Sequence, residues 1–295
     1  MKRLIVNADD FGWTEKINQG IVEGHQNGII TSTTLMANGP AFAHAVGLAK
    51  SASGLGVGIH LNLSDGTPIS NPSGLGVLVN DKGAFHLPPP ALLRKLALRK
   101  IQIKQVEVEL RAQIEKVLQS GLEVTHLDGH KHFHFLPQFL RLVLDLAREY
   151  RIPAIRFARE EVSGIIRLAR KNWRTSPAVA KQFLVGRTLS WLRQAMAPTL
   201  QGKKIRTPDY LIGITSTGYL DTGHLKYLLA RLPAGTCELV CHPGYVDPHL
   251  LQSPTRLLKQ RETELFALLD PAVKEWVDRH DIQLITYKEL SGGIS

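Results

Sequence analysis

The sequence predicts an α/β fold, and within that class a single (β/α) barrel that is TIM-like but irregular, with seven or eight strands. Two observations lead to this prediction. Short apolar runs of strand length alternate with helical patterns along the 295 residues, which is typical of a parallel sheet covered by helices. Polar or ionisable residues follow most of these runs, at the strand ends where barrel enzymes place their chemistry. A doubly wound open sheet is the alternative.

The first βα units have the clearest pattern. Residues 4–6 form a short β-branched run that stops at the polar stretch 7–12, so we expect a buried strand followed by a loop. Thr14 should cap a helix from Glu15 to about Asn27 that Gly28 ends. A second strand at 32–36, a helix at 41–49 and a third strand at 57–63 should follow.

The middle of the chain combines an irregular segment with further βα units. Residues 65–90 are rich in Gly, Pro, Ser and Asn and lack a sustained period, which predicts a long loop or small insertion. A helix is expected over 104–120, closed by Gly121, and a strand over 123–127 leads into a histidine-rich stretch. Pro137 should open a helix over 138–150, before a strand at 154–157.

The alternation resumes after a long helical block. The expected elements are that block at 162–200, divided by Pro177, a strand at 210–215, a helix at 224–231, a strand at 238–241, helices at 255–269 and 271–279, and a last strand at 283–286. We expect one domain over 1–295, with insertions at about 64–103 and 159–206.

The positive charge is concentrated in two blocks. The net charge is +10, yet residues 92–104 carry five basic residues and no acidic one, and residues 151–206 carry thirteen basic and two acidic residues. The rest of the chain therefore has 18 basic and 24 acidic residues, a net −6. Such blocks are typical of a solvated face or of contact with an anionic membrane surface.

The cellular compartment can be predicted from the apolar runs and the cysteines of the sequence. No apolar run approaches the roughly 18–20 residues that span a bilayer, and polar residues follow Val6 too soon for a signal peptide. Cys237 and Cys241 are the only cysteines. On one strand face they would lie about 13 Å apart, too far for a disulfide. These observations predict reduced core thiols and a cytoplasmic protein.

A metal site is predicted from residues at several strand ends. Residues 125–134 contain four of the 12 histidines and an aspartate. Together with the pair Asp9 and Asp10, His60 and His130 supply two imidazoles and one carboxylate for a divalent ion, with a carboxylate to spare. Such a set leaves coordination positions open, so the ion can acidify a bound water and polarise an oxygen that becomes negative. A spare carboxylate suits a general base and His242 a general acid, which predicts metal-assisted hydrolysis.

Five motifs carry a resemblance to a known family. They are residues 7–12 (NADDFG), 31–34 (TSTT), 58–61 (GIHL), 126–134 (HLDGHKHFH) and 241–245 (CHPGY). In order and spacing, over about residues 1–290, the chain resembles the YdjC-like (ChbG-like) carbohydrate deacetylases, distant relatives of the polysaccharide deacetylases. The resemblance implies a distorted (β/α) barrel that binds one divalent ion.

The resemblance also implies individual roles. Asp10, His60 and His130 would be the metal ligands, Asp9 the general base and His242 the general acid. Arg156 resembles the arginine that orients the catalytic aspartate, although the proline expected two residues later is absent. Zn²⁺ is favoured by ligand softness, and Mg²⁺ is allowed by the family. The substrate-binding candidates are Asn62, Asp128, Lys131, His132, His134 and Tyr245.

The expected function is removal of an N-acetyl group from an N-acetylated sugar, either a chitooligosaccharide or lipid-linked glucosamine. Residues 131–134, the basic block at 159–206 and residues 268–271 (LLDP) resemble the branch associated with hopanoid lipid biosynthesis (HpnK-like) more closely than the chitobiose branch. The alternatives are a metal-dependent phosphoesterase and a non-enzymatic basic regulatory protein that binds nucleic acid or membrane. The expected partners are the sugar or glycolipid and no nucleic acid; peripheral contact of the basic blocks with the inner membrane, and a homodimer, are further options.

Overall fold

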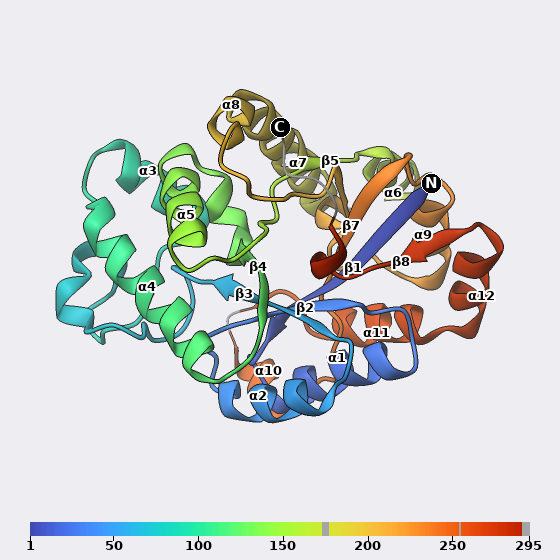
Figure 1. Ribbon diagram of the computed structural model, residues 1–295, viewed down its shortest axis with the longest axis horizontal. Coiled ribbons are helices and arrows are strands. Elements are labelled where there is room, and N and C mark those ends of the chain that lie inside the picture. Colours follow the sequence, from blue (N-terminus) through green and yellow to red (C-terminus); the bar gives the residue numbers. More distant parts are fainter. Residues whose placement is uncertain (173–176, 254, 291–295) are drawn as a thin grey trace.

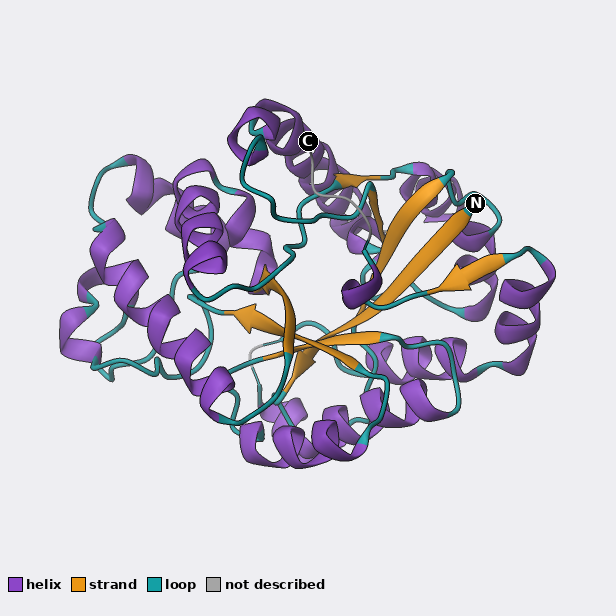
Figure 2. Ribbon diagram, in the orientation of Figure 1, coloured by secondary structure: helices purple, strands orange, loops and turns teal. Residues whose placement is uncertain are grey.

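Eight parallel strands form one strongly curled sheet with helices packed around its outside (Figures 1 and 2). The computed structural model describes residues 1–172, 177–253 and 255–290. The strands are β1 (Lys2–Phe11), β2 (Ser32–Leu35), β3 (Gly56–Leu61), β4 (Val124–Gly129), β5 (Arg159–Glu160), β6 (Tyr210–Ile212), β7 (Gly235–Cys241) and β8 (Ile282–Leu284).

The strand order is that of a barrel opened at one place. The order is β4-β3-β2-β1-β7-β6-β5, which is the cyclic order of a seven-stranded (β/α) barrel interrupted between β4 and β5. The additional strand β8 lies off this path, beside the first residues of β1. Isolated bridges, Leu127 with Ile155 and Ala154 with Arg206, lie at this interruption. The predicted irregular barrel is therefore confirmed as a curled half-barrel, and the doubly wound alternative is wrong because its strand order differs.

The helices cover the outer face of the sheet. They are α1 (Glu15–Gln26), α2 (Phe42–Ser51), α3 (Pro89–Ala97), α4 (Ile103–Gln119), α5 (Pro137–Glu149), α6 (Ser163–Asn172), α7 (Pro177–Ala195), α8 (Ala197–Leu200), α9 (Thr222–Leu229), α10 (Pro248–Gln252), α11 (Gln260–Leu269) and α12 (Pro271–Arg279). Short 3₁₀ turns are η1 (Pro72–Gly74), η2 (Gly76–Leu78), η3 (His130–Phe135), η4 (Ile214–Ser216) and η5 (Tyr287–Glu289). None of the helices in the described ranges is long and apolar enough to cross a membrane.

Local sequence signals explain several helix boundaries. The Thr14 hydroxyl accepts a hydrogen bond from the Ile17 amide at 3.1 Å, so the predicted cap of α1 is confirmed and satisfies one of the free amides of the first turn. Pro137 opens α5 and Pro271 opens α12, where a missing N–H costs nothing.

Other boundaries differ from the prediction. β1 does not stop at residue 6 but continues to Phe11, because its backbone pairs with β2 and β7 through the polar residues. The predicted strand at 154–157 makes only single-residue bridges, and β5 lies two residues later. Proline at 153 has no N–H to donate to a ladder. The strand predicted at 210–215 ends at Ile212, and the helix predicted from 255 begins at Gln260.

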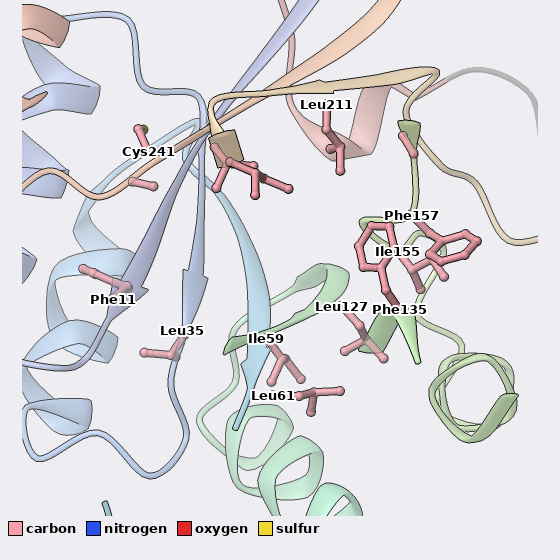
Figure 3. Close-up of a cluster of buried hydrophobic side chains, with 14 of the residues drawn as sticks. Phe11, Leu35, Ile59, Leu61, Leu127, Phe135, Ile155, Phe157, Leu211 and Cys241 are labelled. Atoms are coloured by element: carbon pink, nitrogen blue, oxygen red, sulfur yellow. The ribbon is translucent and has the colours of Figure 1, made fainter. Parts of the chain in front are cut away.

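One main hydrophobic core fills the space between the sheet and the helices. Figure 3 shows part of this core, with buried side chains from β1 to β4, from the 155–157 segment and from η3, and with the rings of Phe135 and Phe157 beside each other. Each fully buried Leu, Ile or Phe contributes roughly 1.5–3 kcal/mol through loss of water contact. Cys237 and Cys241 belong to this core as free, buried thiols, as predicted. The single domain over 1–295 stays a prediction.

Candidate metal and catalytic site

A bulge in β1 directs two consecutive carboxylates into one cavity. The pairing of β1 with β2 shifts register between Ala8 and Phe11, and Asp10 has a left-handed backbone with φ of 67°. In a regular strand, adjacent side chains face opposite ways. Here Asp9 and Asp10 both line the same cavity, because the bulge inserts one extra residue and so redirects the side chain that follows it.

Three side chains from β1, β3 and η3 form a cluster that fits a divalent cation. Asp10 Oδ1 lies 3.2 Å from His130 Nδ1 and 3.6 Å from His60 Nε2. The two imidazole nitrogens are 3.1 Å apart. Asp10 Oδ1 is buried and accepts no hydrogen bond, which is costly without a ligand. One carboxylate and two imidazoles are a common donor set for a divalent ion with open positions.

Each imidazole of the cluster has a carboxylate behind it. His60 Nδ1 donates to Asp128 Oδ1 at 2.7 Å, which leaves Nε2 free to face the cluster. His130 Nε2 lies 3.1 Å from Asp65 Oδ2, which leaves Nδ1 facing Asp10. Carboxylates in this position fix the tautomer and ring orientation of metal-binding histidines. Burial would lower the pKa of His130, but Asp10 and Asp65 outweigh it and raise that pKa to about 9.

Arg156 connects the second carboxylate of β1 to the rest of the sheet. Its Nη1 and Nη2 donate to the two Asp9 oxygens at 2.8 and 2.7 Å. Nη1 also lies 2.6 Å from Asp128, and Nε donates to Glu238 at 2.7 Å. All of these side chains are buried. Burial alone would raise the pKa of Asp9, yet the Arg156 guanidinium holds it well below the usual range.

His242 approaches the site from the end of β7. Its Nε2 lies 3.9 Å from Asp9 Oδ2, and its backbone amide donates to Glu264 at 2.6 Å. Burial lowers the pKa of His242 to about 4, so the free imidazole is neutral at pH 7. Arg261 donates from Nη2 to Asp10 Oδ2 at 2.6 Å, which leaves the other Asp10 oxygen for the cluster.

Asp65, Arg261 and Glu264 were not predicted from the sequence. Asp65 lies in the segment expected to be a loop, and no spacing rule links a loop carboxylate to a histidine 65 residues later. Arg261 and Glu264 sit three residues apart on one face of α11 and are 2% and 1% exposed. Buried polar residues within an amphipathic pattern were the signal that could have revealed them.

A family model described as YdjC-like protein matches residues 3–279. The chain belongs to the YdjC-like family. Two relatives, each named carbohydrate deacetylase, come from Brevibacillus brevis (34% identity over 290 residues, 98% of this chain and 99% of the relative) and Geobacillus stearothermophilus (36% over 289 residues, 97% of each). A crystal structure from Enterococcus faecalis V583, provisionally assigned to cellobiose-phosphate cleavage, matches with TM-score 0.76 and 28% identity over 99% of both chains.

The three histidines and the lysine of η3 in this YdjC-like chain have different surroundings. Lys131 and His132 have left-handed backbones, with φ of 54° and 58°, and both line the cavity. Lys131 forms an ion pair with Asp65. His134 is fully buried and donates from Nε2 to the Arg156 carbonyl oxygen at 2.8 Å.

Four predicted substrate-binding residues do not line this cavity. Asp128 and His134 lie behind it, as described. Asn62 is buried and donates to the Asp65 carbonyl oxygen at 2.7 Å. Tyr245 donates its hydroxyl to Glu23 at 2.6 Å. These contacts hold the loops and strand ends around the YdjC-like site.

The cavity of this YdjC-like chain has a volume of about 950 Å³, at the upper end of small-molecule sites. Its floor is the polar cluster, and its walls come from α3, η3, α7 and the segment before α11. The apolar side chains of α3 and α7 that line it are Leu92, Leu93, Leu184, Val185, Leu189 and Leu192. Both helices lie in the segments predicted as insertions at 64–103 and 159–206, which stays a prediction.

Proposed function

We propose that this protein is a metal-dependent N-deacetylase of an N-acetylated sugar. The observation that carries the proposal is the cluster of Asp10, His60 and His130 beside Asp9 and His242, at the strand ends of a curled parallel sheet. The name carbohydrate deacetylase of the relatives supports the reaction class, which is the enzyme class expected from the sequence.

The ligands would be Asp10, His60 and His130, with Asp65 and Asp128 as positioning residues. When bound, Mg²⁺ or Zn²⁺ would polarise the acetyl carbonyl and lower the pKa of water. The two imidazoles favour Zn²⁺. Arg261 neutralises part of the Asp10 charge and fixes its orientation.

Asp9 is the general base in this proposal. It takes a proton from the attacking water, and Arg156 holds both of its oxygens in place. The low pKa of Asp9 makes it a weak base that releases the proton again readily. The departing amine therefore receives a proton that came from the water.

His242 is the general acid, and its position explains how that proton arrives. The imidazole is neutral before the reaction, because burial lowers its pKa. Its Nε2 lies 3.9 Å from Asp9 Oδ2, within reach after a small shift. The proton passes from Asp9 to His242 and then to the amine nitrogen as the C–N bond breaks.

The apolar walls favour lipid-linked glucosamine over a chitooligosaccharide. Sugar hydroxyls need polar partners, and Lys131, His132 and Asp65 on the floor can supply them. The leucines and valine of α3 and α7 would instead contact an apolar group carried by the sugar. The resemblance to the hopanoid-associated branch stays a prediction, as do the cytoplasmic location and the homodimer.

Acetate release tests the reaction. Purified protein should release acetate from N-acetylated oligosaccharides or from lipid-linked N-acetylglucosamine, lose activity with a chelator, and regain it with Zn²⁺ or Mg²⁺. Asp10→Ala and His130→Ala should abolish turnover, whereas His280→Ala, an exposed histidine on the far end of α12, should not. Unchanged turnover in either site variant would refute the assignment, and phosphate release from esters without acetate release would favour the phosphoesterase alternative.

A further inference from the structure

Exposed apolar side chains gather on two helices at the entrance of the cavity. Among the described residues, eleven large apolar side chains are exposed, and six of them belong to α3, its C-cap or α7. These six are Leu93, Leu98, Phe183, Leu184, Val185 and Trp191. Scattered exposed leucines are normal, but a group of this size indicates a binding surface.

The same helices line the cavity, so the apolar surface continues into the site. Leu93, Leu184 and Val185 are both exposed and part of the cavity wall. Leu184, Thr188 and Trp191 follow at helical spacing and share one face of α7. Leu184 is 67% and Trp191 65% exposed. In Figure 1, α3 and α7 both lie in the upper half of the view.

The segments that carry this apolar surface also carry many basic side chains and no acidic ones. Residues 92–104 contain five basic residues and residues 162–207 contain ten, without any Asp or Glu. The exposed basic side chains on and beside the two helices are Arg94, Arg99, Lys100, Lys181 and Arg187. Leu and Trp with Lys and Arg around them match the acyl and headgroup layers of an anionic bilayer.

We propose that the outer faces of α3 and α7 form a docking surface for a bilayer that contains anionic lipid. Leu93, Leu184 and Trp191 insert among the lipids, and Arg94 and Arg187 contact the headgroups. The mouth of the cavity then opens toward the membrane. The surface is independent of the proposed reaction, because it requires only these exposed side chains.

Other occupants fit the charges less well. A second copy packed through this face would bring the same basic side chains of both copies together, and like charges in contact repel. A nucleic acid would pair with the basic residues but would leave Leu184 and Trp191 without an apolar partner. An anionic bilayer satisfies both kinds of side chain.

Vesicle co-sedimentation with the full chain tests the proposal. Binding to vesicles of phosphatidylcholine with phosphatidylglycerol should exceed binding to pure phosphatidylcholine by at least about 10-fold, and high salt should reduce it. Arg94→Glu with Arg187→Glu should weaken binding by about 5-fold or more for each charge removed. Lys50→Glu, an exposed lysine on α2, should have little effect.

The apolar contribution has a matched control. Leu184→Ser with Trp191→Ser should lose most vesicle binding. Leu251→Ser with Phe266→Ser, which changes side chains that are 57% and 58% exposed on α10 and α11, should retain it. Equal loss in both double variants, or binding indifferent to salt and anionic lipid, would overturn the proposal.

Fluorescence provides a measurement on the unaltered chain. Brominated lipids should quench the tryptophan emission of the wild type on vesicle binding, and Trp191→Phe should remove most of that quenching. Absence of quenching would refute insertion of Trp191. If light scattering shows a dimer that Leu184→Ser dissociates, the face is an interface between two copies and the membrane proposal is wrong.

Discussion

The polar site at the strand ends and the helical walls above it differ in the contacts that hold them in place. In the site, Asp9, Asp128 and Arg156 come from different strands and hold one another through short hydrogen bonds. In the walls, α7 packs on β5 and η4 through buried side chains such as Leu189 and Leu192, and Gln182 Nε2 donates to the Thr217 carbonyl oxygen at 2.7 Å. The polar site is therefore held by ionic hydrogen bonds between strands, whereas α7 is held mainly by apolar packing on one of its faces.

The helix α7 approaches η4 closely at Gly186. A Cβ on Gly186 would lie 2.3 Å from Thr215 Cγ2, so only glycine allows this close approach. Below it, Glu160 Oε1 accepts hydrogen bonds from the Thr215 amide and hydroxyl, both at 3.0 Å. One helix face thus carries the contact with the half-barrel, and the opposite face is exposed.

The largest effect is expected at the centre of the cluster. Asp10→Ala removes the carboxylate that faces both imidazoles, so turnover should fall on the order of 10⁴-fold and calorimetric Zn²⁺ binding should be lost. Asp81→Ala, an exposed aspartate, is the control and should leave both unchanged. Retained metal binding in Asp10→Ala would contradict the ligand assignment.

Replacement of Arg156 should destabilise the protein more than a substitution on the exposed face of α7. Arg156→Met leaves Asp9, Asp128 and Glu238 buried without their cation, so the free energy of unfolding should fall by about 3–5 kcal/mol. Arg187→Met on the exposed face of α7 should change it by less than about 0.5 kcal/mol. Urea denaturation of both variants measures the difference, and similar values would remove the distinction between the two regions.

The contact between sheet and α7 should depend on pH through Glu160. Burial raises the pKa of this carboxyl from 4.5 to about 7, so the folded protein binds its proton more tightly than the unfolded chain. The resulting stabilisation is complete below pH 4.5 and is lost as pH rises to about 7. Relative to Glu160→Gln, the wild type should lose about 3 kcal/mol over this range. Parallel stability curves for the two proteins would show that Glu160 does not titrate this way.

Replacement of the carboxylates that contact the two imidazoles should lower metal affinity by an intermediate amount. Asp65→Asn and Asp128→Asn each remove an acceptor that fixes a histidine tautomer, so metal affinity should fall about 10–100-fold. Isothermal titration with Zn²⁺ measures this effect independently of turnover. Unaltered affinity in Asp65→Asn would indicate that the loop carboxylate serves Lys131 alone.

A substitution in the walls should have the smallest effect on stability and should affect KM only for a substrate that carries an apolar group. Leu93→Ala should raise KM for a lipid-linked substrate several-fold and leave kcat for a short N-acetylated sugar unchanged, because its exposed apolar side chain lines the cavity but has no polar group to contact the sugar. Its stability should stay within about 0.5 kcal/mol of the wild type. A kcat loss on the short sugar would mean that the walls also shape the reaction geometry.

The sequence predicted the site better than the walls for a physical reason. Asp10 and His60 lie in the last residues of β1 and β3, and His130 follows β4. Parallel strands bring their carboxyl ends to one rim whatever the helices do. Arg261 reaches the site from one face of α11. The apolar periodicity of a helix predicts which side chains are buried, but it does not predict which residues they contact. The position of α7 over the cavity depends on the close contact at Gly186, which no pattern of apolar residues reveals.

The polar stretch of β1 shows the same limit at a smaller scale. Residues 7–12 were predicted to be a loop because a polar stretch follows the β-branched run at residues 4–6. In the structure Arg156 and Arg261 neutralise both side chains, and β7 pairs with the backbone through Ala8. Tertiary partners from distant parts of the chain therefore override the local propensity.

The bulge in β1 has a consequence for how the reaction tolerates motion. Since the proposed base Asp9 and the proposed ligand Asp10 are consecutive, one trans peptide unit sets their Cα atoms about 3.8 Å apart. Movement of the helices or of the whole sheet carries both carboxylates together. Covalent bonds therefore limit how far apart the two residues can move, and the hydrogen bonds from Arg156 to Asp9 and from Arg261 to Asp10 set the orientation of the two carboxylates.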